Sequence, residues 1–302
     1  MTDVTQHLAP VSKPAGTYDE AVARVTALQA KDGPDVRDDS RTRLWSQGKK
    51  VEHTLVYYHG YTNAPPQFKI LGEELCKQGY NVLVARLPYH GLKNPLTTEQ
   101  SKMTAEAMAA LTQETVDIAQ GLGNKVTIAG LSAGGVMAAW AAQFRPDVDL
   151  AVVIGPAFGL PFVPGWVSSL FGFGVRHLPN FYVWWDPRVK EKIVGPPHAY
   201  PRFSTKGLEE TFRLGKEVRR AAKSTKPAAR KIQVVLSDFD TAIHLPTAKK
   251  VAAEWKDHGA DVSEYVFAKD LKIWHDMIDP AQSTQRVDVV YPVLLPLLTQ
   301  NV

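Results

Sequence analysis

Short apolar runs alternate with longer amphipathic stretches over most of the chain. Apolar runs rich in β-branched residues predict buried strands at residues 54–58, 81–85, 125–129, 150–154, 232–236 and 262–267. Apolar residues at helical spacing predict helices at residues 18–28, 66–78, 104–122, 133–144, 246–257 and 283–298. A short edge strand is expected at residues 41–47. The alternation of strands and helices predicts βαβ units, and therefore an α/β fold with a mostly parallel central sheet and helices on both faces.

The alternation stops after Gly155. Residues 156–228 are rich in glycine, proline and aromatic residues, and they predict short helices and turns inserted above the sheet as a helical cap. The core is then expected to comprise residues 1–155 and 229–302, with a loose N-terminal tail at about 1–16. Aromatic residues early in the insertion are candidate walls of a substrate pocket: Phe158, Phe162, Trp166 and Phe171.

Composition adds limits to this picture. Of the 302 residues, 44% are hydrophobic and 22% are charged, which is ordinary for a globular protein with a sizeable core. The net charge of +4 is too small and too evenly spread to predict nucleic-acid binding. The densest basic stretch, residues 216–231, is interpreted as a solvated helix face and loop; the alternative is a rim that attracts anionic substrates or a membrane surface.

The N-terminus and the single cysteine bear on location. The N-terminal residues show no basic region followed by an apolar run, so a signal peptide is not predicted. The sequence also shows no run of about 18 apolar residues, so an integral membrane segment is not predicted. Cys76 has no second cysteine with which to form an internal disulfide. These features predict a cytoplasmic protein.

The first motif with chemical meaning is Gly130-Leu131-Ser132-Ala133-Gly134, which matches G-x-S-x-G. It stands between a predicted strand and a predicted helix, the setting in which this motif forms a sharp turn that exposes a nucleophilic serine. Such a turn is strained and needs small neighbours, which the glycines supply. We therefore predict that Ser132 is a nucleophile; the alternative is a glycine-rich turn with an ordinary helix-capping serine.

A loop that directly follows the first strong strand reads His59-Gly60-Tyr61-Thr62. In hydrolases with this type of turn, such a loop supplies one backbone N–H to the oxyanion, and the residue after the nucleophile supplies the other. The predicted donors are the N–H groups of Tyr61 and Ala133. His59 is interpreted as structuring the loop rather than as the general base.

A general base and an orienting acid are expected after the later strands. His275 follows the last predicted strand, where a neutral imidazole could take the proton of the serine. After the strand at 232–236, the turn offers Asp238 and Asp240, of which we favour Asp240 because it stands closer to the following helix. The chain order is then Ser132, Asp240, His275.

With these residues, the chain resembles the α/β-hydrolase family from about residue 54 to its end, and most closely bacterial carboxylesterases and monoacylglycerol-lipase-like serine hydrolases. One further motif, Pro88-Tyr89-His90-Gly91, carries the resemblance with a departure, because Tyr89 replaces the more usual glycine. The resemblance implies cleavage of a small-molecule ester through an acyl-enzyme. No cofactor or metal is expected, because no metal-ligand spacing, P-loop or NAD fingerprint appears.

Two alternatives to an esterase stay open at this point. One is an amidase or peptidase with the same three residues, since a peptidase that binds a free amino terminus needs acidic residues in the cap, and the cap contains Asp186, Glu191, Glu209 and Glu210. The other is a non-catalytic ligand-binding homologue. Dehalogenases and epoxide hydrolases of this fold use an aspartate nucleophile, so Ser132 argues against both.

Overall fold

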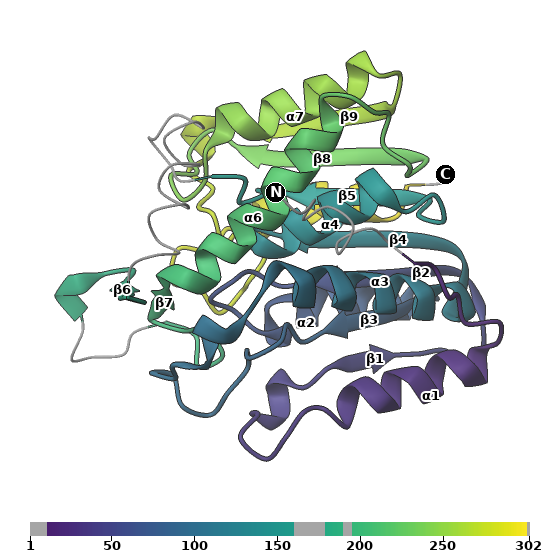
Figure 1. The fold of residues 1–302 in the computed structure, drawn as a ribbon, viewed down its shortest axis with the longest axis horizontal. Coiled ribbons are helices and arrows are strands. Elements are labelled where there is room, and N and C mark those ends of the chain that lie inside the picture. Colours follow the sequence, from purple (N-terminus) through teal and green to yellow (C-terminus); the bar gives the residue numbers. More distant parts are fainter. Residues whose placement is uncertain (1–10, 160–178, 190–194, 301–302) are drawn as a thin grey trace.

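The computed structural model describes residues 11–159, 179–189 and 195–300. Within these residues the main sheet has seven strands in the order β1-β3-β2-β4-β5-β8-β9 (Figure 1). Their bounds are β1 (Arg43–Trp45), β2 (Val51–Tyr58), β3 (Asn81–Ala85), β4 (Gly123–Leu131), β5 (Leu150–Ile154), β8 (Lys231–Ser237) and β9 (Asp261–Phe267). Only β1, at the edge, pairs antiparallel among these strands. The predicted fold class is therefore confirmed, and the short strand predicted at 41–47 is the edge strand β1.

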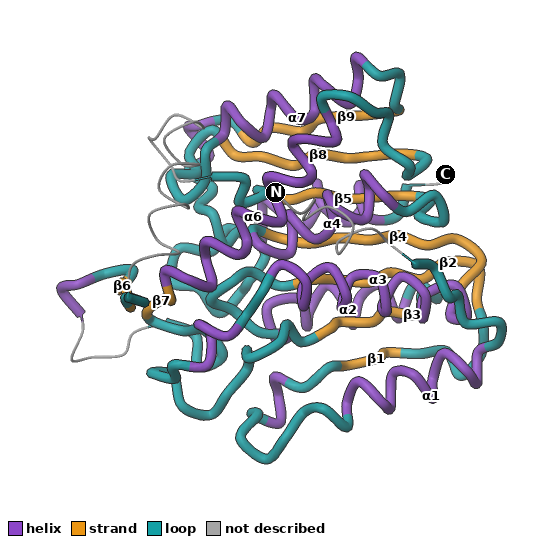
Figure 2. Tube along the Cα trace, in the orientation of Figure 1, coloured by secondary structure: helices purple, strands orange, loops and turns teal. Residues whose placement is uncertain are grey.

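Helices cover both faces of this sheet (Figure 2). Their bounds are α1 (Tyr18–Gln29), α2 (Lys69–Lys77), α3 (Ala105–Leu122), α4 (Ala133–Phe144), α6 (Thr205–Ala222), α7 (Leu245–Asp257) and α8 (Val287–Leu298). Alternate residues of a strand point to opposite faces. In β2, Val56 and Tyr58 accordingly belong to the core cluster under α1, α3, α4, α6 and α7, whereas Leu55 and Tyr57 belong to the cluster under α2 and α8.

Two helices differ in extent from the sequence prediction. The helix predicted at 66–78 opens with a 3-10 turn, η3 (Pro65–Phe68), before α2 begins. The last helix begins at Val287 rather than near residue 283. No helix in the described parts of the chain is both long and apolar enough to cross a bilayer.

The predicted insertion contains two described features. Strands β6 (Tyr182–Trp184) and β7 (Arg202–Ser204) form a two-stranded antiparallel ribbon that projects from the body of the molecule (Figure 1). The helix α6 instead packs on α4 and α3, and its residues Leu214, Val218 and Ala222 are buried in the same core cluster as α4. The division into a core and a cap at residues 156 and 228 stays a prediction.

Candidate active site

Ser132 lies at a sharp turn between β4 and α4. Its backbone has φ 61° and ψ −113°, a conformation that a residue with a side chain rarely adopts. Close approach of the backbone makes glycine necessary around it: a Cβ on Gly134 would lie 1.9 Å from the carbonyl oxygen of Tyr58, and one on Gly130 would lie 2.1 Å from that of Gly134. The strained turn predicted from the motif is therefore present, with its serine at the N-terminus of α4.

His275 and Asp240 meet above the ends of β8 and β9. The Asp240 Oδ2 atom lies 2.7 Å from His275 Nδ1, and the Asp240 side chain is completely buried. The N–H of Ala242 donates a hydrogen bond to Asp240 Oδ1 (2.8 Å), which fixes the carboxylate. Asp238 lies apart, half exposed in an ion pair with Lys249. Of the two candidate acids, Asp240 is therefore the one in contact with the imidazole.

The environment of His275 sets its protonation. Burial lowers the pKa of His275, but the negative charge of Asp240 and its hydrogen bond outweigh burial, and Asp276 adds to them. The pKa of His275 is consequently raised above the ordinary histidine value of 6.5. Because Nδ1–H donates to Asp240, the neutral ring carries its free lone pair on Nε2.

The loop at residues 59–63, here called the oxyanion loop, passes close to Ser132. A Cβ on Gly60 would lie 3.7 Å from Ser132 Cβ. The N–H of Gly60 donates to Gln67 Oε1 (3.0 Å). Within the described residues, the N–H groups of Tyr61 and Ala133 have no protein acceptor. These two N–H groups therefore stay the predicted donors to an oxyanion.

His59 has a structural position in this loop. The side chain is fully buried, its Nδ1 donates to the carbonyl of Gly60, and its Nε2 accepts the N–H of Leu87. Burial holds the pKa of His59 well below its ordinary value. The tyrosine that departs from the family motif, Tyr89, adopts a left-handed backbone (φ 65°) at the surface and does not line the cavity at Ser132.

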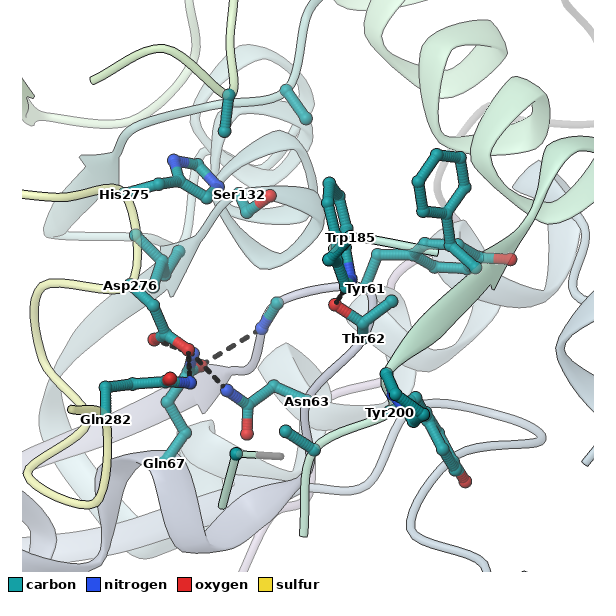
Figure 3. Close-up of a pocket in the computed structure, with 18 of the residues that line it drawn as sticks. Tyr61, Thr62, Asn63, Gln67, Ser132, Trp185, Tyr200, His275, Asp276 and Gln282 are labelled. Carbon is teal, nitrogen blue, oxygen red and sulfur yellow. Dashed lines mark hydrogen bonds between the residues drawn. The ribbon is translucent and has the colours of Figure 1, made fainter. Parts of the chain in front are cut away.

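A cavity of about 480 Å³ opens above Ser132 and His275. One side is apolar and is formed by the β6–β7 ribbon, by residues of the segment that joins its two strands, and by α6: Trp184, Trp185, Tyr200, Phe203, Leu208 and Phe212. Another side is polar and is formed by Asn63, Gln67, Asp276 and Gln282. Figure 3 draws Ser132 and His275 above Asp276, Gln67 and Asn63, with Trp185 and Tyr200 to their right.

The four aromatic residues predicted as pocket walls have different outcomes. Phe158 is almost completely buried in the core, where it packs against Gly215 of α6, and it is not among the residues that line the cavity. This is a correction: its ring lies in the core cluster beside α6 rather than facing the cavity. Phe162, Trp166 and Phe171 lie outside the described residues. The residues of the apolar side could not be selected from the sequence, because the aromatic residues of the insertion show no pattern that tells which of them face the cavity.

The polar side of the cavity centres on Asp276. Its carboxylate accepts hydrogen bonds from the side-chain amides of Asn63 (2.8 Å), Gln67 (2.6 Å) and Gln282 (2.6 Å). Burial, followed by the charge of Asp279, raises the pKa of Asp276 to about 6. In the sequence, only its position next to His275 could have pointed to Asp276. Within the described residues, no three His, Cys, Asp or Glu side chains gather in a way that could hold a metal ion.

Comparison with known proteins relates the chain to hydrolases. The model of a family described as serine aminopeptidase, S33 matches residues 49–269. A thermostable monoacylglycerol lipase from Bacillus sp. (strain H-257) is 28% identical over 165 residues, which are 53% of this chain and 60% of the lipase. The chain thus spans less than two thirds of the length of this relative.

Two solved structures show the same fold at low identity. A soluble variant of monoglyceride lipase from Saccharomyces cerevisiae, in complex with a substrate analogue, superposes with a TM-score of 0.62 at 12% identity, covering 86% of this chain and 91% of the other. The monoacylglycerol lipase of Paleococcus ferrophilus superposes with a TM-score of 0.60 at 18% identity, covering 85% and 97%.

Proposed function

Because this chain belongs to the serine aminopeptidase S33 family of α/β-hydrolases, we propose that it is a serine hydrolase that cleaves carboxylic esters. In this proposal Ser132 is the nucleophile, His275 the general base and Asp240 the acid that orients the base. One observation carries the proposal: the strained turn at Ser132 shares a cavity with the imidazole of His275, which is hydrogen-bonded to the buried carboxylate of Asp240. The fold alone would not support it, since many functions share this fold.

Acylation follows from these positions. His275 Nε2 takes the proton of Ser132 Oγ as the oxygen attacks the ester carbonyl carbon, and the carbonyl electron pair moves to its oxygen. The N–H groups of Tyr61 and Ala133 bind this oxyanion. The oxyanion then re-forms the carbonyl, and the C–O bond to the leaving oxygen breaks as this oxygen takes the proton of the imidazolium, which Asp240 stabilises at 2.7 Å. The alcohol leaves, and the acyl group remains on Ser132.

Deacylation repeats these steps with water. His275 Nε2 takes a proton from a water molecule, whose oxygen attacks the acyl carbon, and the same two N–H groups bind the second oxyanion. Ser132 Oγ leaves as it regains a proton from the imidazolium. The acid product is released, and the neutral tautomer of His275 is restored.

Charge in the cavity favours an ester over a peptide with a free amino terminus. Of the acidic residues that could bind such an amine, Asp186 lines the cavity, but both its oxygens accept hydrogen bonds from Arg188. Glu210 pairs with Arg213, Glu209 is buried outside the cavity lining, and Glu191 lies outside the described residues. Asp276 already accepts three hydrogen bonds, which leaves it poorly suited to bind an ammonium group.

The proposal is tested by hydrolysis of p-nitrophenyl esters of increasing acyl length beside matched anilides. We expect turnover of the esters and much slower turnover of the anilides. Faster cleavage of the anilides would favour the amidase alternative. Tight binding of the esters without release of nitrophenol would favour the non-catalytic ligand-binding alternative.

The pH dependence should reflect the raised pKa of His275. Only the neutral ring can accept the serine proton, so activity is lost as the pH falls and His275 becomes protonated. Because Asp240 raises that pKa, we expect kcat/KM to fall by half at a pH above the ordinary histidine value of 6.5. The measurement is kcat/KM for an uncharged ester between about pH 5 and about pH 9. A midpoint at or below 6.5 would contradict this assignment of the base.

The apolar side of the cavity should receive the acyl chain. Each buried methylene contributes about 0.8 kcal/mol, or about fourfold in kcat/KM, until this side is filled. Leu208 of α6 lines it, so Leu208→Trp should move the best substrate to a shorter acyl chain. The check is the chain-length profile of kcat/KM, with Lys206→Trp, an exposed position of the same helix, as the matched control. An unchanged profile in Leu208→Trp would place the acyl chain elsewhere.

A further inference from the structure

Asp276 joins two loops of the site that are distant in sequence. It belongs to the loop that carries His275, whereas its partners Asn63 and Gln67 lie in and just after the oxyanion loop. Figure 3 shows the hydrogen bonds from Asn63, Gln67 and Gln282 converging on this one carboxylate. The loop of the base and the loop of the oxyanion donor are therefore linked directly through Asp276.

The orientation of two of these amides is fixed by their other contacts. Gln67 Oε1 accepts the N–H of Gly60 (3.0 Å) and the hydroxyl of Tyr57 (2.7 Å), and Asn63 Oδ1 accepts the N–H of Ala64 (2.9 Å). Turning either amide over would bring its NH₂ group against a donor. Both amides therefore direct their NH₂ groups at position 276, which needs a side chain that only accepts. An ionised aspartate is such a side chain.

The path from Asp276 to the proposed oxyanion donor is short. It runs from Asp276 Oδ1 to Gln67 Nε2 and from Gln67 Oε1 to the N–H of Gly60, the residue before Tyr61. A second connection reaches Asn63, two residues after Tyr61. The opposite side of the loop is held by the β6–β7 region, where Trp185 Nε1 donates to Thr62 Oγ1 (3.0 Å). Asp276 thus supplies the connection that faces the base.

We propose that Asp276 is a positioning residue, which keeps the N–H of Tyr61 aligned with Ser132 and His275 by tying the oxyanion loop to the loop of the base. This inference rests on the proposed function. Donors stabilise an oxyanion only when they are already aimed at it, and a misplacement of about 1 Å can lower a rate about 100-fold. In this role Asp276 acts through Tyr61, beside its smaller contribution to the raised pKa of His275.

The test is Asp276→Asn, which keeps the shape of the side chain but places an NH₂ group against the fixed amide of Asn63 or Gln67. We expect kcat for a p-nitrophenyl ester to fall about 10- to 100-fold while KM changes less than about threefold. The inhibition constant of a trifluoromethyl ketone, whose adduct with Ser132 places an oxyanion between the two N–H groups, should rise in proportion. Asp270→Asn, the same change at an exposed position of the preceding segment, should alter kcat less than about twofold.

A double variant separates alignment from a general loss of structure. In Asn63→Asp/Asp276→Asn, the carboxylate and the amide exchange places, so the amide at 276 can accept from Gln67 and donate to position 63. We expect kcat of the double variant to be at least about tenfold higher than kcat of Asp276→Asn. If Asp276→Asn does not fold, Asn63→Ala replaces it, because it removes one of the two connections and leaves the carboxylate in place. A lower kcat with a higher inhibition constant then supports the proposal, and unchanged values overturn it.

Hydrogen–deuterium exchange gives a readout that needs no activity. Asp276→Asn should increase deuterium uptake in a peptide that covers residues 60–67, and Asp270→Asn should not. If wild type hydrolyses esters but Asp276→Asn matches it in kcat, inhibition and exchange, the positioning role is wrong and the proposed function stands. If wild type hydrolyses no ester, the proposed function fails, and exchange still decides whether Asp276 holds the loop.

Discussion

Replacing Ser132 with alanine should lower kcat for p-nitrophenyl esters by at least about 10⁴-fold. The substitution removes the oxygen that attacks the carbonyl, and no other group in the proposed mechanism can take its place as the nucleophile. Binding should persist, because the walls of the cavity are unchanged, so KM or the affinity for an unreactive amide analogue should shift less than about threefold. The measurement is steady-state kinetics on purified wild type and variant.

The control for this variant is Ser224→Ala, an exposed serine just after α6. It should retain wild-type kinetics. Ester hydrolysis by Ser132→Ala within about tenfold of wild type would mean that another residue is the nucleophile or that the hydrolysis is not enzymatic.

The second large effect is expected from Asp240→Asn, about 10⁴-fold in kcat. The N–H of Ala242 holds the Oδ1 position as an acceptor, so the amide of the variant would direct its NH₂ group at His275 Nδ1. The ring would then carry its proton on Nε2, where the mechanism needs a lone pair. Ser132 would lose its proton acceptor although the shape of the site is kept.

Asp238→Asn is the matched control for this prediction. Asp238 is half exposed and pairs with Lys249, and exposed ion pairs contribute little. Its kcat should stay within about twofold of wild type. Comparable losses in the two variants, or a larger loss in Asp238→Asn, would show that the acid was assigned to the wrong residue of this turn.

The strands and the turn at Ser132 could be predicted from the sequence because they depend on local patterns. Buried parallel strands appear in the sequence as short apolar runs. The run at 54–58 lies inside β2, and the run at 150–154 coincides with β5. The glycines at 130 and 134 are set by backbone contacts within the turn and against the end of β2, so the motif carries its own geometry. The choice of Asp240 over Asp238 also followed from position along the turn.

The cavity and its polar side could not be predicted in this way. Phe158 reads as one more aromatic residue of the insertion, and only the packing of α6 on α4 shows that its ring belongs to the core. Asn63, Gln67 and Gln282 carry no motif, since their role depends on a carboxylate more than 200 positions from the first two. Contacts of this range arise from the sheet order, in which β9 follows β8 at one edge while the oxyanion loop follows β2.

The most direct test of Ser132 as the nucleophile is covalent labelling. Wild type is treated with a fluorophosphonate, digested, and analysed by mass spectrometry. We expect one adduct, on the peptide that contains Ser132, formed more slowly at low pH as His275 becomes protonated and absent in Ser132→Ala. An adduct on another residue, or no adduct in an enzyme that hydrolyses esters, would contradict the account.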